Sequence, residues 1–148
     1  MADSFQKSDG MNYAPVGTAK PVVEKGTFKF AAVGLDHGHI YGMCNGLMEA
    51  GAELVYVSDI DESKVSEFIR KYPMAKTASL NEVLSDPEIK LIAAAIVPGD
   101  RGELGIKVME SRKDYFTDKP PMVSIEDFDK VKDTEEKTGK KYIVNYKE

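Results

Sequence analysis

The sequence predicts an α/β fold in which a doubly wound, mostly parallel sheet of about six strands carries helices on both faces. Three observations predict this fold. Short apolar segments alternate along the chain with segments of helical periodicity. The connections between them are short, which favours neighbouring parallel strands joined by right-handed crossovers. Finally, residues 91–97 form a continuous apolar run, which is typical of a central parallel strand buried on both faces.

The first strand–helix–strand unit occupies residues 28–58. Residues 28–33 predict a short buried strand that ends at Gly34. Residues 53–58 predict the second strand. Between them, a helix that Gly51 ends is predicted by apolar residues at helical spacing, namely Ile40, Met43, Cys44 and Leu47.

Two further helices follow the second strand. The first presents one apolar face and ends before Pro73, and this face consists of Val65, Phe68, Ile69 and Tyr72. Ser79 and Glu82 have the spacing of a capping box, in which each side chain satisfies the backbone N–H of the other residue. This box predicts a short helix that ends near Pro87.

After the apolar run, the alternation continues to the end of the chain. Residues 101–112 predict a helix and residues 114–117 a short strand. Ser124 can cap the next helix and Gly139 can end it. Residues 141–146 predict the last strand. The side chains expected to face inward from the capped helix are those of Ile125, Phe128 and Val131.

The composition excludes several classes of function. The chain has 148 residues, about the length of one domain. With 20 Lys and Arg against 25 Asp and Glu, its net charge is −5, so it lacks the basic footprint of a nucleic-acid or anionic-membrane binder. No apolar stretch approaches the roughly 18 residues of a membrane span, and no signal peptide is visible. The single cysteine, Cys44, cannot form an internal disulfide, so we expect a cytoplasmic location.

Residues 1–26 differ from the rest of the chain. They are polar, contain Pro15 and Pro21, and show no sustained periodicity, which predicts a tail. The alternative is an arm that packs on a partner subunit through residues 12–16. Residues 27–148 contain no internal repeat or linker, so they form the predicted domain. The oligomeric state stays open.

The turn after the first predicted strand has the position of a phosphate-binding loop. In such sheets ligands lie at the carboxyl ends of the strands, and the following helix presents free N–H groups to an anion. The pattern G-x-G-x-x-G is not met, because Asp36 and His39 replace its second and third glycines. A tight connection without a ligand is therefore the alternative. The candidate contacts of a pyrophosphate are Gly34, Asp36, His37, Gly38, His39 and Ile40.

The two histidines of this turn also allow a metal site, with Cys44 or Asp36 as a further ligand. We favour no metal, because His37 and His39 are only two residues apart and the sequence shows no other cluster of ligands.

Asp59 follows the second predicted strand, 25 residues after Gly34. An acidic residue at about this distance accepts both ribose hydroxyls of adenosine and repels a 2′-phosphate. The next residues supply no arginine for such a phosphate, which favours NAD over NADP. The alternative is that Asp59 or Asp61 only caps the next helix.

Two later turns also follow predicted strands. Pro98 begins a turn of small residues, in which Arg101 either contacts a phosphate or starts a helix. Asp118 and Lys119 precede Pro120, and a lysine at a strand end can polarise a carbonyl or assist proton transfer. A surface lysine in a turn is the alternative.

Together these motifs resemble the N-terminal domain of the Gfo/Idh/MocA oxidoreductases. The resemblance covers about residues 28–146 and rests on the strand that ends at Gly34, on Asp59, on Pro98, and on Asp118-Lys119-Pro120 at the place of the family's Glu-Lys-Pro motif. The histidine-containing turn is similar to one branch of the family. The resemblance implies a Rossmann-type fold and hydride transfer between NAD(P) and a hydroxyl carbon of a sugar- or cyclitol-like substrate.

The resemblance also implies a role for each motif. Gly34, Gly38 and His39 line the pyrophosphate, and Asp59 binds the adenine ribose. Pro98 lies at the nicotinamide side. Lys119 contacts the substrate hydroxyl and the nicotinamide ribose, and the Lys119–Pro120 bond is cis. The family's asparagine and histidine after the fourth strand are replaced here by Gly99 and Arg101.

Family enzymes continue into a second domain that binds substrate and dimerises, whereas this chain ends at Glu148, about where that domain begins. We therefore expect the chain to be the NAD-binding domain of such a dehydrogenase, inactive alone, with catalytic Lys119. The alternative is a non-catalytic nucleotide-binding sensor or regulatory module.

Overall fold

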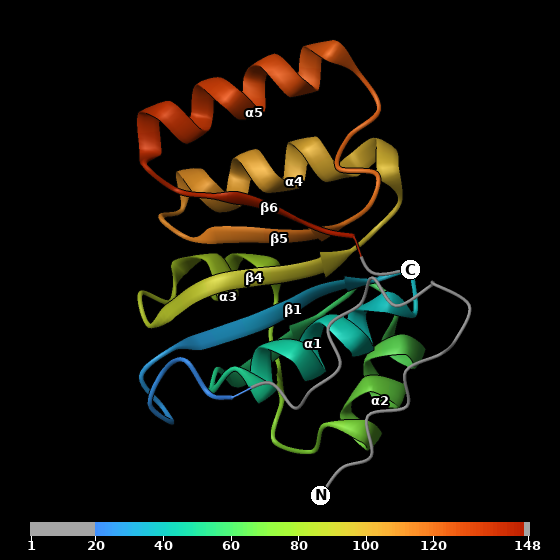
Figure 1. Ribbon diagram of the computed structural model, residues 1–148. Helices are drawn as coiled ribbons and strands as arrows, with labels where there is room; N and C mark the ends of the chain where they lie inside the picture. The colour runs from blue at the N-terminus through green and yellow to red at the C-terminus, as the bar shows by residue number, and fades with distance from the viewer. Residues whose placement is uncertain (1–19, 147–148) are drawn as a thin grey trace, which may run out of the picture.

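The computed structural model describes residues 20–146 (Figure 1). The predicted tail or arm therefore lies mostly outside the described residues. Its described end contacts the C-terminal end of the first helix, because the N–H groups of Val22 and Val23 donate to the carbonyl of Ala50 at 2.8 and 3.3 Å.

The described chain alternates strands and helices throughout. The strands are β1 (Lys29–Leu35), β2 (Glu53–Ser58), β3 (Lys76–Thr77), β4 (Ile89–Ala95), β5 (Asp114–Asp118) and β6 (Tyr142–Asn145). The helices are α1 (His39–Glu49), α2 (Glu62–Lys71), α3 (Leu80–Ser85), α4 (Pro98–Glu110) and α5 (Ile125–Thr138).

The strands form one parallel sheet in the order β3-β2-β1-β4-β5-β6. The chain first builds outward from β1 to β3 and then returns to the other side of β1 with β4. This reversal makes β1 and β4 central neighbours, and it confirms the doubly wound fold. It also brings the loops after β1 and β4 together, at the position where such sheets bind ligands.

Helices cover both faces of the sheet, and each face has its own core (Figure 1). Because side chains alternate along a strand, Phe30 and Ala32 of β1 face one core while Ala31 and Val33 face the other. The first core packs against α1 and α2, and the second against α3 and α4.

Two boundaries after the middle of the chain differ from those that the sequence predicts. Strand β4 begins at Ile89 and ends at Ala95, so Ile96 and Val97 leave the sheet and form the turn. Helix α4 begins at Pro98 rather than Arg101, because proline at the first helical position needs no partner for a missing N–H. The turn of small residues is therefore the first turn of a helix.

The prediction for α5 is wrong at two positions. Ile125 and Phe128 are 78% and 52% exposed, whereas Val131 is buried as predicted. In α5 the buried side chains are those of Val131 and Thr134, so the inward face begins after the first turn. The sequence also did not predict the position of strand β3, because its two residues are exposed and show no apolar pattern.

Within the described residues, no helix combines the length and the apolarity that a membrane span requires.

Candidate functional site

The carboxyl ends of β1, β2 and β4 surround a cavity of about 360 Å³. Side chains from the predicted phosphate turn, from the end of β2 and from the first turns of α4 line it. The lining residues are Val33, Gly34, Asp36, Ser58, Asp59, Ile60, Leu80, Ile96, Asp100, Glu103, Leu104 and Lys107. The cavity therefore brings Gly34, Asp36 and Asp59 together, as the sequence predicts, but its lining does not include the histidines.

Gly34 permits the close contact between the loops after β1 and β4. Its φ is +79°, and a Cβ atom at this position would collide with the side chain of Ile96. The turn can thus pass close to β4 only with glycine here, which leaves the cavity open beside it.

The carboxylate of Asp59 is fixed at the end of β2 by two backbone hydrogen bonds. Oδ2 accepts from the N–H of Leu35 at 2.7 Å and Oδ1 from the N–H of Asp61 at 2.8 Å. Each oxygen retains a lone pair for another donor. Asp61, not Asp59, caps α2, because its side chain accepts from the N–H groups of Ser63 and Lys64. These bonds, led by those of Ser63, hold the pKa of Asp61 below its ordinary value.

Asp36 occupies the place of the second glycine and turns toward α2. Its Oδ1 lies 2.8 Å from Nζ of Lys64, and both side chains are 37% exposed. This ion pair offsets the negative charge that would otherwise repel a phosphate. The hydrogen bond from Lys64 to Asp36 also raises the pKa of that lysine, so it is charged at neutral pH.

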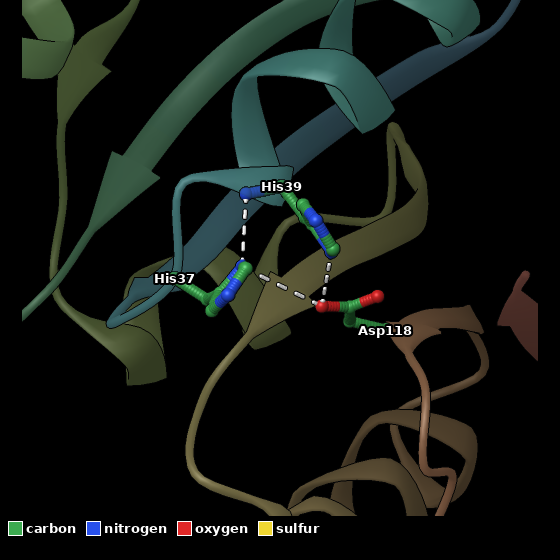
Figure 2. Close-up of side chains that lie close together, drawn as sticks. All are labelled: His37, His39 and Asp118. Atoms are coloured by element: carbon green, nitrogen blue, oxygen red, sulfur yellow. Dashed lines mark hydrogen bonds and ion pairs between the residues drawn. The ribbon is translucent and has the colours of Figure 1, made fainter. Parts of the chain in front are cut away.

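The two histidines meet Asp118 at the N-terminus of α1 (Figure 2). Nδ1 of His37 accepts from the N–H of His39 at 3.2 Å, so the His37 ring covers that end of the helix. Nδ1 of His39 lies 2.8 Å from Oδ2 of Asp118, whose side chain is 3% exposed. Gly38 is the N-cap of α1, whereas the side chain of Ile40 is buried in the core.

Arg101 is buried and connects the loops after β4 and β5. Its Nε donates to the carbonyl of Ile96 at 2.8 Å, and its Nη1 donates to the carbonyls of Asp118 and Pro120 at 3.0 and 2.7 Å. With 3% of its surface exposed, the guanidinium holds backbone in place. Arg101 does not start the helix, because α4 begins at Pro98, and its guanidinium donates to backbone carbonyls instead. The sequence did not predict this structural role.

Lys119 lies at the end of β5 and its side chain is exposed. Its N–H donates to Oδ1 of Asp118 at 2.9 Å, and the following bond to Pro120 is cis, as the resemblance implies. Pro98 follows β4 and occupies the first position of α4.

Sequence reasoning missed the apolar lining of the cavity, namely Ile60, Leu80, Ile96 and Leu104, and it missed the partners of the predicted residues. Lys64 pairs with Asp36, but the local sequence does not indicate this pairing, because Lys64 lies on the solvent side of α2. The contact between His39 and Asp118 joins residues 79 positions apart, and only the strand order brings them together.

Comparisons with known proteins identify the family of this chain. The model of a family described as oxidoreductases with an NAD-binding Rossmann fold, GFO_IDH_MocA, matches residues 28–146. The chain is 41% identical to a protein from Erwinia carotovora atroseptica described as an oxidoreductase, with a TM-score of 0.76 over 79% of this chain and 35% of that one. A comparison with curated proteins gave no match.

Two further structures carry ligands. Myo-inositol dehydrogenase from Lactobacillus casei, in complex with NAD(H) and myo-inositol, is 26% identical with a TM-score of 0.69, over 80% of this chain and 36% of that chain. The WlbA dehydrogenase from Bordetella pertussis, in complex with NADH and UDP-GlcNAcA, is 19% identical with a TM-score of 0.70, over 81% and 36%, and shows the fold alone.

The chain therefore spans about a third of the length of these relatives. The family model, in contrast, covers most of the chain, including Asp59 and Lys119. The protein thus belongs to the Gfo/Idh/MocA oxidoreductase family and comprises its NAD-binding Rossmann domain.

Proposed function

We propose that this domain binds NAD across the carboxyl ends of β1, β2 and β4, and that it supplies the cofactor half of a dehydrogenase. The reaction would be hydride transfer between NAD and a hydroxyl carbon of a sugar- or cyclitol-like substrate. The observation that carries the proposal is the Asp59 carboxylate, held by two backbone N–H groups on the wall of the cavity beside Gly34.

The residues of the cavity fit an adenosine. The remaining lone pairs of Asp59 can accept the two ribose hydroxyls. Apolar side chains of Ile60, Leu80 and Leu104 offer a surface for the adenine ring. Ile60 is fully exposed without a ligand, and such a side chain gains from being covered by an aromatic ring.

The pyrophosphate would then lie over the turn at residues 36–39, at the N-terminus of α1. Lys64 neutralises Asp36 there, and the exposed ring of His37 can leave the N–H of His39 to a phosphate oxygen. The same carboxylate that binds the ribose repels a 2′-phosphate, which supports NAD rather than NADP.

Bound NAD would supply the hydride acceptor at its nicotinamide ring. In this proposal Lys119 contacts the substrate hydroxyl and can move its proton, since its side chain is exposed at the end of β5 beside Asp118. Myo-inositol dehydrogenase from Lactobacillus casei supports the substrate class, because its structure contains NAD(H) and a polyhydroxylated ring.

Calorimetric titration tests the cofactor role. We expect saturable binding of NAD(H) and weaker binding of NADP(H). Asp59→Asn should weaken NAD binding and reduce the preference over NADP, because it removes the negative charge and half of the acceptors. Glu62→Gln is the matched control, since it removes a nearby exposed carboxylate that makes none of these contacts. No binding at millimolar NAD(H) would sink the proposal, and a preference for NADP would sink the role of Asp59.

Turnover needs the longer protein that the relatives represent. In such a protein, Lys119→Ala should leave NAD binding unchanged and abolish hydride transfer. If that longer protein binds NAD tightly but turns over no polyhydroxylated substrate, the domain is instead a nucleotide sensor. Asp36 at the second glycine position favours this second candidate, because it departs from the pattern of tight dinucleotide binders.

We also propose a cytoplasmic location, which the lone cysteine supports and which cell fractionation tests.

A further inference from the structure

We propose that His37, His39 and Asp118 form a binding site for a divalent transition-metal ion of the zinc type. The sequence offers only two histidines two positions apart. The fold adds a third donor, because the end of β5 brings Asp118 to the N-terminus of α1 (Figure 2). One ligand atom from each of the three residues lies within 4.8 Å of the others.

The spacing of these atoms suits a tetrahedral ion. Two ligands that are each about 2.0 Å from a tetrahedral zinc ion lie about 3.3 Å apart. Oδ2 of Asp118 lies 2.8 Å from Nδ1 of His39 and 3.7 Å from Nδ1 of His37, so the two distances bracket this value. The partly exposed imidazoles can move to complete the geometry.

The charge of Asp118 supports a cation at this place. Its carboxylate is 3% exposed, and its ion-pair partners among residues 20–146 are only the two imidazoles. Arg101 donates to the backbone carbonyl of Asp118, not to its side chain. A carboxylate removed from water is costly unless it is compensated by hydrogen bonds and a positive charge. A metal ion between the three side chains would supply it.

Two of the three donors already carry a free lone pair, whereas Nδ1 of His39 donates to Oδ2 of Asp118 and would give up its proton when the ion binds. The N–H of Lys119 binds Oδ1 of Asp118 and leaves Oδ2 directed at the rings. Nδ1 of His37 accepts a hydrogen bond, so it carries a lone pair rather than a proton, as a metal ligand must. The N–H of His37 donates to the carbonyl of Ala95 at 3.0 Å, which fixes this turn to β4.

The site would keep an open coordination position. The His37 and His39 side chains are 56% and 42% exposed, so solvent reaches the place of the ion. Three protein ligands with one open position are the arrangement of reactive zinc sites, where water or an anionic oxygen takes the fourth place. None of the three residues lines the cavity at Asp59, so an adenosine bound there leaves the place of the ion free. The pyrophosphate of a bound dinucleotide, in contrast, would share the turn at residues 36–39 with the ion.

Titration of the chelator-treated, metal-free protein with Zn²⁺ and Co²⁺ tests the proposal. We expect one ion per chain and the intense visible absorption of tetrahedral Co²⁺. His37→Gln, His39→Gln and Asp118→Asn should each weaken binding by at least about 100-fold, since outer-shell groups alone are worth 10–100-fold. Glu62→Gln is the matched control, because it removes an exposed carboxylate outside the ligand set, and the affinity of this variant for the metal should not change.

Absence of saturable binding would overturn the proposal, and so would equal affinity in the wild type and the His37→Gln and His39→Gln variants. Circular dichroism checks that each variant folds. If Asp118→Asn does not fold, His37→Gln decides the test, because the exposed His37 can be replaced without disturbing the fold. Titration of the metal-free protein with NAD separates this result from the proposed function, because either binding can fail while the other persists.

Discussion

Gly34 is the residue on which the turn after β1 depends. Gly34→Ala should destabilise the protein by about 2–4 kcal/mol, because alanine is strained at φ +79° and its Cβ would collide with Ile96. Urea unfolding measures the change. Gly99→Ala is the control, since its Cβ would meet no atom within 4 Å and it lies in helix α4, so its stability should be unchanged or slightly raised. Equal losses in both variants would contradict this account.

Cys44 provides a second test at the scale of a residue. It is fully buried on α1, and burial raises the pKa of its thiol to about 12. The thiol is therefore protonated and shielded at pH 8, and a disulfide reagent such as DTNB should react with it slowly in the native protein and rapidly in urea. The chain has one cysteine, so the signal has a single source.

The same shift has a consequence for stability. The folded state keeps the thiol proton between the ordinary value of 9.0 and about 12, whereas the unfolded state releases it. Cys44 should therefore reduce the free energy of unfolding as the pH rises through this window. In the DTNB experiment, a fast reaction of the native protein at pH 8 would contradict the burial of the thiol and show that α1 opens at Cys44.

The sequence was sufficient to predict those site residues whose role depends on their place at the end of a strand. Gly34 is the penultimate residue of β1, which runs one residue beyond the end that the sequence predicts, and Asp59 directly follows β2. Both lie at carboxyl ends of parallel strands, and these ends share one edge of the sheet. Arg101 could not be assigned in the same way, because its three acceptors come from two loops whose contact depends on the sheet order.

At the scale of elements, Arg101 joins the turn after β4 to the turn after β5. Arg101→Met should lower the free energy of unfolding by about 2–4 kcal/mol, because it leaves buried carbonyls of these turns without a donor. Chemical denaturation measures this loss. Arg112→Met, on the exposed end of the α4–β5 connection, should change stability by less than about 0.5 kcal/mol. If Arg101→Met leaves the free energy of unfolding unchanged, water replaces the guanidinium as the donor to these carbonyls.

Elements with a local stop or start signal could be predicted closely. The capping box of Ser79 and Glu82 is present, and Gly139 ends α5 with a φ of +70°. The inward face of α5 could not be predicted, because Ile125 and Phe128 have the spacing of a buried face, and only the tertiary structure shows that both are exposed. Strand β3 depends on pairing with β2 and has no pattern of its own.

At the scale of the whole molecule, the order of elements and the right-handed crossover were sufficient to predict the fold. They also predicted the edge at which a cofactor would lie, because β1 and β4 emerge side by side where the chain reverses its direction of growth. The metal-ligand cluster was not predicted, since it depends on how far the end of β5 reaches toward α1.

The sheet separates two packed cores, and this makes their energetics independent. Phe68 lies in the core under α1 and α2, and Val108 in the core under α3 and α4. Phe68→Leu and Val108→Ala should therefore lower the free energy of unfolding additively, within about 0.5 kcal/mol, in a double-mutant cycle. Phe68 and Tyr72, whose rings lie 4.8 Å apart, should show coupling instead. Evolution can then alter the helices on one face without a compensating change on the other.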